Sequence, residues 1–295
     1  MSRGKIVDAI KGGRVLVSDG AWGTFLQKLG MKPGECPELW AIDHFGDVKG
    51  IAANYIAAGA DMVEADSFGG TCYKLEHFGL EGRVSEINEA AARASREAAG
   101  DDHWVIASIG PTGKMLVMEE VTEEEMYNAF KEQAIALEKG GADAVCIETM
   151  SDIDEATIAI KAAKENTALE VICTFTFEKT VKGDYRSMMG ATPEKAALAS
   201  LEAGADIIGT NCGNGIERMI DIVKQIRGVA PDAPILVHAN AGLPVNVDGK
   251  DTFPDSPEDM ARLVGGLVEA GANIVGGCCG TTPDHISAMK QALSK

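Results

Sequence analysis

The chain has 295 residues, of which 45% are apolar and 24% are charged, so it can fill either one large core or two small ones. Its 45 acidic and 27 basic residues give a formal charge of −18, which repels phosphate groups and argues against nucleic acids and anionic membranes as partners. No stretch approaches the roughly 20 uninterrupted apolar residues of a membrane span, and residues 1–14 lack the apolar centre of a secretory signal. We expect a cytoplasmic protein.

Eight apolar runs, each short enough for a buried strand, recur along the chain. They lie at 14–20, 58–69, 103–111, 140–150, 170–177, 203–213, 234–242 and 270–280. Every second run opens with one phrase: a glycine suited to ending a helix, then Ala-Asp or Ala-Asn, then residues rich in Val and Ile. The recurrence indicates a repeated unit in which a helix ends and a strand begins.

The segments between these runs have the apolar periodicity of helices. The clearest are 121–141, 153–165, 191–204, 215–228 and 256–271. Thr192-Pro193 and Ser256-Pro257 each supply a capping residue followed by proline at the first helical position. The acidic run 119–125 predicts a solvated helix start, where negative charge is favourable to the helix dipole.

Strands that alternate with helices predict an α/β fold in which helices cover a parallel sheet. Eight such units favour a single (β/α)8 TIM barrel over an open doubly wound sheet. No linker rich in Pro, Ser or Gly divides the chain, so we expect one domain spanning 1–295. The longest irregular stretches, 21–46 and 178–191, follow the first and fifth strands and are expected as loops at the barrel mouth.

Polar residues stand where the predicted strands end: Asp19 after the first, 64–67 after the second, Glu148 after the fourth and Asn240 after the seventh. Catalytic groups of barrels occupy these ends because the βα loops form the open face. A carboxylate such as Glu148, placed directly after a buried apolar run, needs a partner. His238 shares a strand face with Asn240, and we interpret it as a hydrogen-bonded core histidine.

Three of the seven cysteines are predicted to converge on this face. Cys212 ends the sixth strand, and Cys278 and Cys279 end the eighth, its near neighbour in the ring. Adjacent strand residues face opposite sides, so this pair can share a metal only where the chain turns, and the glycines of 276–280 permit the turn. Three thiolates and an open position, to be taken by water, substrate sulfur or an oxygen such as that of Asn240, are typical of catalytic zinc.

Two other interpretations stay open at this point. The small residues of 276–280 could merely permit a tight turn, with the cysteines as buried apolar side chains. Alternatively, the loops after the seventh and eighth strands could bind a phosphate, although paired thiolates would oppose an anion. Barrel geometry favours the metal, because it gathers all three cysteines at one face. The other four cysteines are interpreted as core residues: Cys36, Cys72, Cys146 and Cys173.

Nearly the whole chain resembles the homocysteine-binding family of methyltransferases, and two motifs carry the resemblance most specifically, GTNCG at 209–213 and GGCCGTTP at 276–283. Weaker matches are SDGAWGT at 18–24, DSFGGTCYKLEHFGL at 66–80, IGPTGKML at 109–116, FTFEK at 175–179 and NAGLP at 240–244. The family includes the betaine and S-methylmethionine enzymes and the homocysteine module of cobalamin-dependent methionine synthase. The second strand and the IGPTGK turn are most similar to the methionine synthase branch.

The resemblance implies a zinc-dependent enzyme in which Cys212, Cys278 and Cys279 bind Zn²⁺ and form the catalytic centre. A free thiol has a pKa near 8.5, and coordination to zinc would ionise it outright. The substrate implied is L-homocysteine, whose sulfur would then attack a methyl group and form methionine. Zinc would here prepare a nucleophile rather than polarise a carbonyl group.

The resemblance also implies residues that bind the substrate. Asp19 and Glu148 are implied to bind its ammonium group. The backbone amides around Gly20 and Ala21 are expected to hold its carboxylate, and Asn240 is expected among the residues that contact the substrate.

The methyl donor is expected to arrive separately, because the chain has no DxHxxG sequence of the type that supplies a histidine to cobalamin. The branch resemblance favours methylcobalamin, or another methylcorrinoid, carried by a separate corrinoid protein. The alternatives are a free donor such as S-methylmethionine or betaine, and a non-catalytic module that only binds zinc and a thiol.

Overall fold

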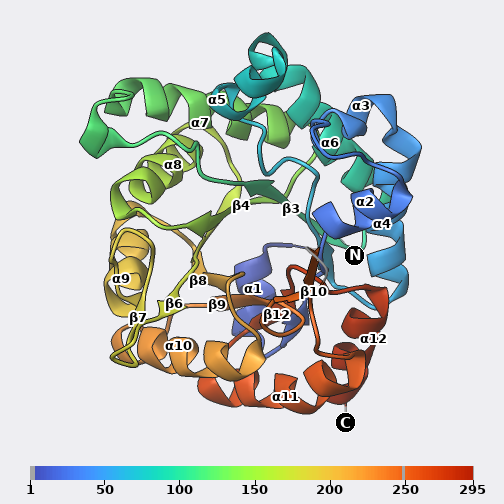
Figure 1. Ribbon diagram of the computed structural model, residues 1–295, viewed down its shortest axis with the longest axis vertical. Helices are drawn as coiled ribbons and strands as arrows, with labels where there is room; N and C mark the ends of the chain where they lie inside the picture. The colour runs from blue at the N-terminus through green and yellow to red at the C-terminus, as the bar shows by residue number, and fades with distance from the viewer. Residues whose placement is uncertain (1–3, 248–249, 295) are drawn as a thin grey trace.

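The computed structural model describes residues 4–247 and 250–294, which form an α/β barrel with eight parallel strands at its centre (Figure 1). In chain order the strands are β1 (Leu16–Val17), β2 (Met62–Val63), β3 (Trp104–Ile109), β4 (Ala144–Met150), β5 (Glu170–Phe175), β8 (Ile207–Asn211), β9 (Ile235–Ala239) and β12 (Ile274–Gly277). Their order in the sheet is β1-β12-β9-β8-β5-β4-β3-β2. Each strand falls in one of the eight predicted runs, so the predicted TIM barrel is confirmed.

Helices form the outer layer around this sheet (Figure 1). They are α4 (Phe45–Ala57), α6 (Val84–Ala99), α7 (Glu123–Lys139), α8 (Ile153–Asn166), α9 (Pro193–Ala203), α10 (Ile216–Val229), α11 (Pro257–Ala270) and α12 (Pro283–Leu293). Their first turns confirm the predicted caps, because Thr192 and Ser256 each accept a hydrogen bond from a backbone N–H of the helix that follows. Thr122 caps α7 in the same way, and the acidic residues 123–125 lie in its first turn. None of the helices in the described residues is long and apolar enough to span a membrane.

The short helix α1 (Ile6–Lys11) closes the N-terminal end of the barrel. Ile6 and Ile10 belong to a buried cluster that includes one or more residues from every barrel strand, such as Leu16 and Met62. The backbone N–H of Ile6 also donates to a carboxylate oxygen of Glu170 at 2.6 Å. The opposite end of the barrel, at the C-termini of the strands, is left for the βα loops.

The repeated Ala-Asp or Ala-Asn phrase has a structural role beyond starting a strand. In each copy the acidic or amide residue donates its backbone N–H to a residue of the preceding strand and accepts that residue's N–H on its side chain. The pairs are Asp61 with Val17, Asp143 with Val105, Asp206 with Val171, and Asn273 with Ile235. A basic side chain binds each of the four: Lys290, Arg96, Lys164 and Arg227, respectively. The contact of Asp61 with Val17 joins β1 to β2, the two end strands of the sheet order.

Two stretches expected as loops contain secondary structure. Residues 21–46 include α2 (Gly23–Leu29), α3 (Trp40–Asp43) and the first residues of α4, and 178–191 include a hairpin of β6 (Glu178–Lys179) and β7 (Tyr185–Arg186). Apart from α4, these elements are two to seven residues long, which is too short for a hydrophobic period to become visible in the sequence. Further short elements are α5 (Cys72–Leu75), the 3₁₀ turns η1 (Glu76–Phe78), η2 (Glu81–Arg83) and η3 (Leu116–Met118), and the hairpin of β10 (Val245–Val247) and β11 (Lys250–Thr252).

Candidate active site

A cavity of about 410 Å³ lies at the C-terminal ends of the barrel strands. Its lining combines the three cysteines predicted to bind metal with four carboxylate side chains, those of Glu38, Glu64, Asp66 and Glu148. The described residues around the cavity include no lysine or arginine. The cavity therefore favours a ligand with positive charge.

The three cysteines meet in one place. The Sγ atom of Cys279 lies 3.8 Å from that of Cys212 and 3.9 Å from that of Cys278. All three sulfurs lie within 4.8 Å of one another. A tetrahedral zinc ion with Zn–S bonds of about 2.3 Å separates its sulfurs by about 3.8 Å. The spacing therefore fits a zinc ion held by three thiolates.

The ends of β8 and β12 bring the cysteines together. Cys212 follows β8 with a φ of 58°, a left-handed conformation that is uncommon outside glycine, and its N–H donates to the carbonyl of His238 at 3.0 Å. Cys278 follows β12 and donates its N–H to the carbonyl of Ala239 at 2.7 Å. Gly280, with a φ of 82°, turns the chain immediately after the pair. The predicted turn at 276–280 is thus confirmed.

Electrostatics in the cluster favour a bound cation. Hydrogen bonds from Cys278 and Cys279 lower the pKa of the Cys212 thiol to about 3. The hydrogen bond to Cys212 in turn raises the pKa of Cys279 to about 12, and that of Cys278 lies well above its ordinary value. Ionisation of Cys212 therefore opposes ionisation of the other two thiols. A divalent cation would remove the repulsion that prevents the other two from ionising.

Asn240 lies beside the cysteines, and its side chain hydrogen-bonds to Cys212. Its Oδ1 atom is buried and has no hydrogen-bond partner among the described residues. Rotation of the amide exchanges its oxygen and nitrogen, which occupy nearly the same volume. With the amide rotated, its oxygen would face Cys212, where an amide oxygen fits the fourth ligand position of a zinc site.

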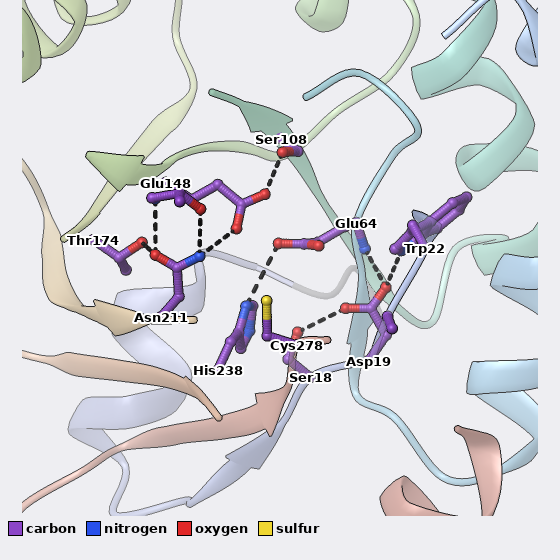
Figure 2. A network of polar contacts seen from close by, with 12 residues as sticks. Ser18, Asp19, Trp22, Glu64, Ser108, Glu148, Thr174, Asn211, His238 and Cys278 are labelled. Carbon is purple, nitrogen blue, oxygen red and sulfur yellow. Dashed lines mark hydrogen bonds and ion pairs between the residues drawn. The ribbon is translucent and has the colours of Figure 1, made fainter. Parts of the chain in front are cut away.

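Glu148 is held through both oxygens of its carboxylate (Figure 2). Ser108 donates to Oε1, and Nδ2 of Asn211 donates to Oε2 at 2.9 Å. Asn211 is itself fixed, because its Oδ1 accepts from the Thr149 N–H and from the Thr174 hydroxyl, both at 2.8 Å. Burial raises the pKa of Glu148 to about 7. The carboxylate is thus oriented in the cavity wall, and each oxygen retains capacity for another donor.

Asp19 follows β1 as predicted, but its side chain is fully buried and is not part of the cavity lining. Its Oδ2 accepts from Nε1 of Trp22 at 2.8 Å and from the backbone N–H of Glu64 at 2.7 Å. Its Oδ1 accepts from the Ser18 hydroxyl at 3.1 Å. Burial raises the pKa of Asp19 to about 6. Asp19 therefore ties the loop after β1 to the end of β2.

Gly20 and Ala21 both line the cavity. The Ala21 N–H donates to Oγ1 of Thr281 at 3.0 Å, and this hydroxyl donates to the carbonyl of Cys278 at 2.7 Å. A Cβ atom on Gly20 would lie 2.6 Å from the same Oγ1, so only glycine fits there. The two residues thus connect the β1 loop to the cysteine loop.

Two further functional candidates line the cavity: Glu64, which the sequence placed only within the range 64–67, and His238, which it indicated as a core histidine. Glu64 lines the cavity, and its Oε1 atom is buried without a hydrogen bond. His238 faces it, with Nδ1 3.5 Å from that oxygen, and its Nε2 has no partner among the described residues. Burial lowers the pKa of His238 to about 4, so the ring is neutral at pH 7. His238 is buried, as predicted, but the interpretation as a hydrogen-bonded core residue is wrong, because its ring also lines the cavity.

The remaining cysteines are free thiols outside this cluster. Cys36, Cys146 and Cys173 are buried, which confirms their interpretation as core residues, whereas Cys72 is half-buried. Cys36 donates to Oε2 of Glu38 at 3.4 Å.

The chain is similar to known proteins in sequence and in fold. The chain spans about a quarter of the length of the curated relatives that it matches. It is 31% identical to a methionine synthase of Mycobacterium leprae, over 96% of this chain and 24% of that protein, and 29% identical to a methionine synthase of Mycobacterium tuberculosis, over 95% and 25%. In fold it is similar to the metallated form of the homocysteine methyltransferase MmuM from Escherichia coli, with a TM-score of 0.79, 19% identity, and coverage of 96% of this chain and 98% of that one.

The family model for homocysteine S-methyltransferase matches residues 16–293, and the chain therefore belongs to this family.

Proposed function

We propose that this protein is a zinc-dependent homocysteine S-methyltransferase that forms methionine with a methyl group from a methylcorrinoid carried by a separate protein. The observation that carries the proposal is the triangle of sulfurs formed by Cys212, Cys278 and Cys279 at the open end of the barrel. Its Sγ separations match tetrahedral zinc, and the amide oxygen of Asn240, rotated to face Cys212, suits the fourth position while no substrate is bound.

The chain's own residues would prepare the substrate for attack. Zinc held by three thiolates would keep the substrate sulfur ionised and nucleophilic at neutral pH. Glu148, fixed on the cavity wall, would receive the substrate ammonium, and the negative charge of Asp19 behind the wall would support it. Gly20 and Ala21 would border the carboxylate end. In the transfer the sulfur gains the methyl group, and the donor leaves with the electron pair of the broken bond.

Exposed apolar side chains around the barrel mouth support a protein as the carrier of the methyl group. They lie on three βα loops, after β3, β5 and β9, and they are Met115, Val117, Met118, Val181, Met188, Met189, Leu243 and Val245. Several large exposed apolar side chains on one face are typical of an interaction surface. A corrinoid protein that docks there would present its methyl group to the cavity.

A free cationic donor such as S-methylmethionine is the second candidate, and the charge of the cavity favours it. In addition to Glu148 and Glu64, the carboxylates of Glu38 and Asp66 line the cavity. Oδ2 of Asp66 is buried without a partner among the described residues. A sulfonium would be stabilised there, whereas betaine would bring its own carboxylate into an acidic cavity. A non-catalytic zinc and thiol module is the remaining alternative.

Metal analysis combined with a donor panel tests the proposal. We expect about one zinc per chain, and methionine from homocysteine with methylcobalamin as the probe donor. Methionine formed only from S-methylmethionine would replace the corrinoid with a free donor. Zinc and thiol binding without turnover by any donor, betaine included, would leave the non-catalytic module. Full activity in metal-free protein would overturn the zinc mechanism itself.

A further inference from the structure

We infer that His285 is a positioning residue of the metal site and that, together with Phe253, it holds the cysteine loop (residues 278–282) in the bend that lets two adjacent thiols face one ion. The inference rests on the metal site of the proposed function and goes beyond it, because it assigns a part to residues outside the cysteine cluster. It also gives the long loop between β9 and α11 a part in that site.

The cysteine loop has a conformation that needs support from outside. Adjacent residues of an extended chain face opposite sides, yet the Sγ atoms of Cys278 and Cys279 lie 3.9 Å apart. Gly280 then continues the bend with a φ of 82°. Once ionised, the two sulfurs repel each other until a cation binds. Contacts that keep the bend in place would therefore preorganise the ligands and strengthen metal binding.

Three hydrogen bonds connect the cysteine loop to His285 by way of the loop after β9. The Ala241 N–H donates to the carbonyl of Cys279, and the Asp255 N–H donates to the carbonyl of Ala241, each at 3.0 Å. Nε2 of His285 lies 3.0 Å from the carbonyl of Asp255. His285 itself lies in the first turn of α12, which directly follows the cysteine loop. The three bonds and the chain thus form a closed ring that includes the loop.

Both ring nitrogens of His285 are used, and their partners fix the tautomer. Nδ1 accepts from the backbone N–H of Thr282 at 3.1 Å, at the start of α12. The carbonyl of Asp255 can only accept, so Nε2 carries the hydrogen and donates it. Capping of α12 needs only the bond to Nδ1. The bond from Nε2 leaves the helix and reaches the loop after β9, and it therefore serves a purpose other than the cap.

Phe253 supplies a second contact with the cysteine loop. A Cβ atom on Gly280 would lie 2.4 Å from both Cβ and Cγ of Phe253, so the aromatic side chain packs directly on the backbone of Gly280. Phe253 and Asp255 both stand near the end of the loop that begins at Asn240. One short segment, residues 253–255, thus provides both contacts with the region of the cysteines.

The test measures how fast zinc leaves the zinc-loaded protein in excess chelator, together with the thermal unfolding of the metal-free form. In His285→Glu a carboxylate oxygen can still accept from the Thr282 N–H, as glutamate does at this position of a capping box, but the side chain no longer donates to Asp255. In His285→Gln the amide can both accept and donate. We expect zinc release at least about fivefold faster in His285→Glu, because a hydrogen bond is lost, and close to the wild-type rate in His285→Gln.

Two matched controls separate this effect from a loss of stability. Thr192 caps α9 and does not line the cavity, so Thr192→Ala should lower the melting temperature and leave zinc release unchanged. Phe253→Ala should speed zinc release in the same direction as His285→Glu. Its control is Ile158→Ala, which truncates another partly buried apolar side chain, on α8, and should leave release unchanged.

Bound cobalt gives a readout that stability alone does not move. The visible absorption bands of Co²⁺ report the geometry of its ligands. At saturating Co²⁺ we expect these bands to change in His285→Glu and in Phe253→Ala, and to match the wild type in both controls.

The outcomes separate this inference from the proposed function. Wild-type protein that binds neither zinc nor cobalt would refute the metal site itself. Zinc release at the wild-type rate in His285→Glu, or equally fast release in His285→Glu and His285→Gln, would overturn the role of His285 alone. If His285→Glu does not fold, Phe253→Ala decides, because unchanged release and unchanged cobalt bands in that variant would also overturn the inference.

Discussion

The Sγ atoms of Cys212 and Cys279 lie 3.8 Å apart although 67 residues separate them in the chain. Two barrel strands, β8 and β12, end on either side of β9 and place these sulfurs at the same level. Cys278 completes the triangle because the chain turns directly after β12. The candidate metal site is therefore a product of the barrel as a whole, and its ligands depend on one another.

Loss of one sulfur is expected to release the metal. Replacing Cys212 with Ala should lower bound zinc from about one per chain to below about a tenth, and methyl transfer should fall by at least about a thousandfold, because zinc binding needs all three thiolates. Metal content and turnover measure both effects. Cys72→Ser is the matched control, since Cys72 is a half-buried free thiol outside the cluster. Unchanged zinc in Cys212→Ala would contradict the ligand assignment.

Removal of the metal is expected to expose thiols without unfolding the barrel. The hydrophobic core surrounds the sheet and does not depend on the cluster. After treatment with a chelator, three additional thiols should react with a disulfide reagent, and the far-ultraviolet circular dichroism should stay unchanged. Added zinc should restore both thiol protection and activity. Loss of secondary structure on chelation would instead make the metal a structural one.

The buried carboxylates predict an unusual dependence of stability on pH in metal-free protein. Burial raises the pKa of Glu148 from 4.5 to about 7. The folded protein thus binds more protons than the unfolded chain between these values, and the free energy of unfolding falls as the pH rises from about 4.5 to 7. Glu148→Gln should remove up to about 3 kcal/mol of this dependence. Denaturant titrations at several pH values measure it, with the exposed Glu81→Gln as control; an identical slope in both variants would refute the effect.

The repeated aspartates at the other end of the barrel are expected to affect stability and not function. Asp206 accepts the Val171 N–H at 2.8 Å and pairs with Lys164. Asp206→Ala should lower the free energy of unfolding by about 1–3 kcal/mol, because a backbone donor loses its partner. The affinity for homocysteine should not change. Asp232→Ala, at an exposed position, is the control, and equal stability of the two variants would contradict this role.

Sequence patterns predicted the barrel and the cysteine site because both depend on regular spacing. Apolar runs at regular intervals located all eight strands, and the rule that active sites occupy the C-terminal ends of barrel strands placed Cys212 with Cys278 and Cys279. Short elements such as α2 and the β6–β7 hairpin were not predicted, because they have too few residues to show a hydrophobic period.

The sequence could not predict which carboxylates line the cavity, for a different reason. Asp19 and Glu64 both follow barrel strands, and nothing in the spacing tells which carboxylate faces the cavity. In the structure the indole N–H of Trp22 donates to Asp19, which does not line the cavity, whereas Glu64 does. Similarly, parity placed His238 with Asn240, but only the register of the strands shows that its ring meets Glu64.

X-ray absorption at the zinc edge, with and without homocysteine, tests the central claim most directly. The account predicts three sulfur neighbours at about 2.3 Å and one oxygen neighbour in the free protein, and four sulfur neighbours once homocysteine is bound. A shell dominated by nitrogen and oxygen, or a sulfur count that homocysteine does not change, would contradict it.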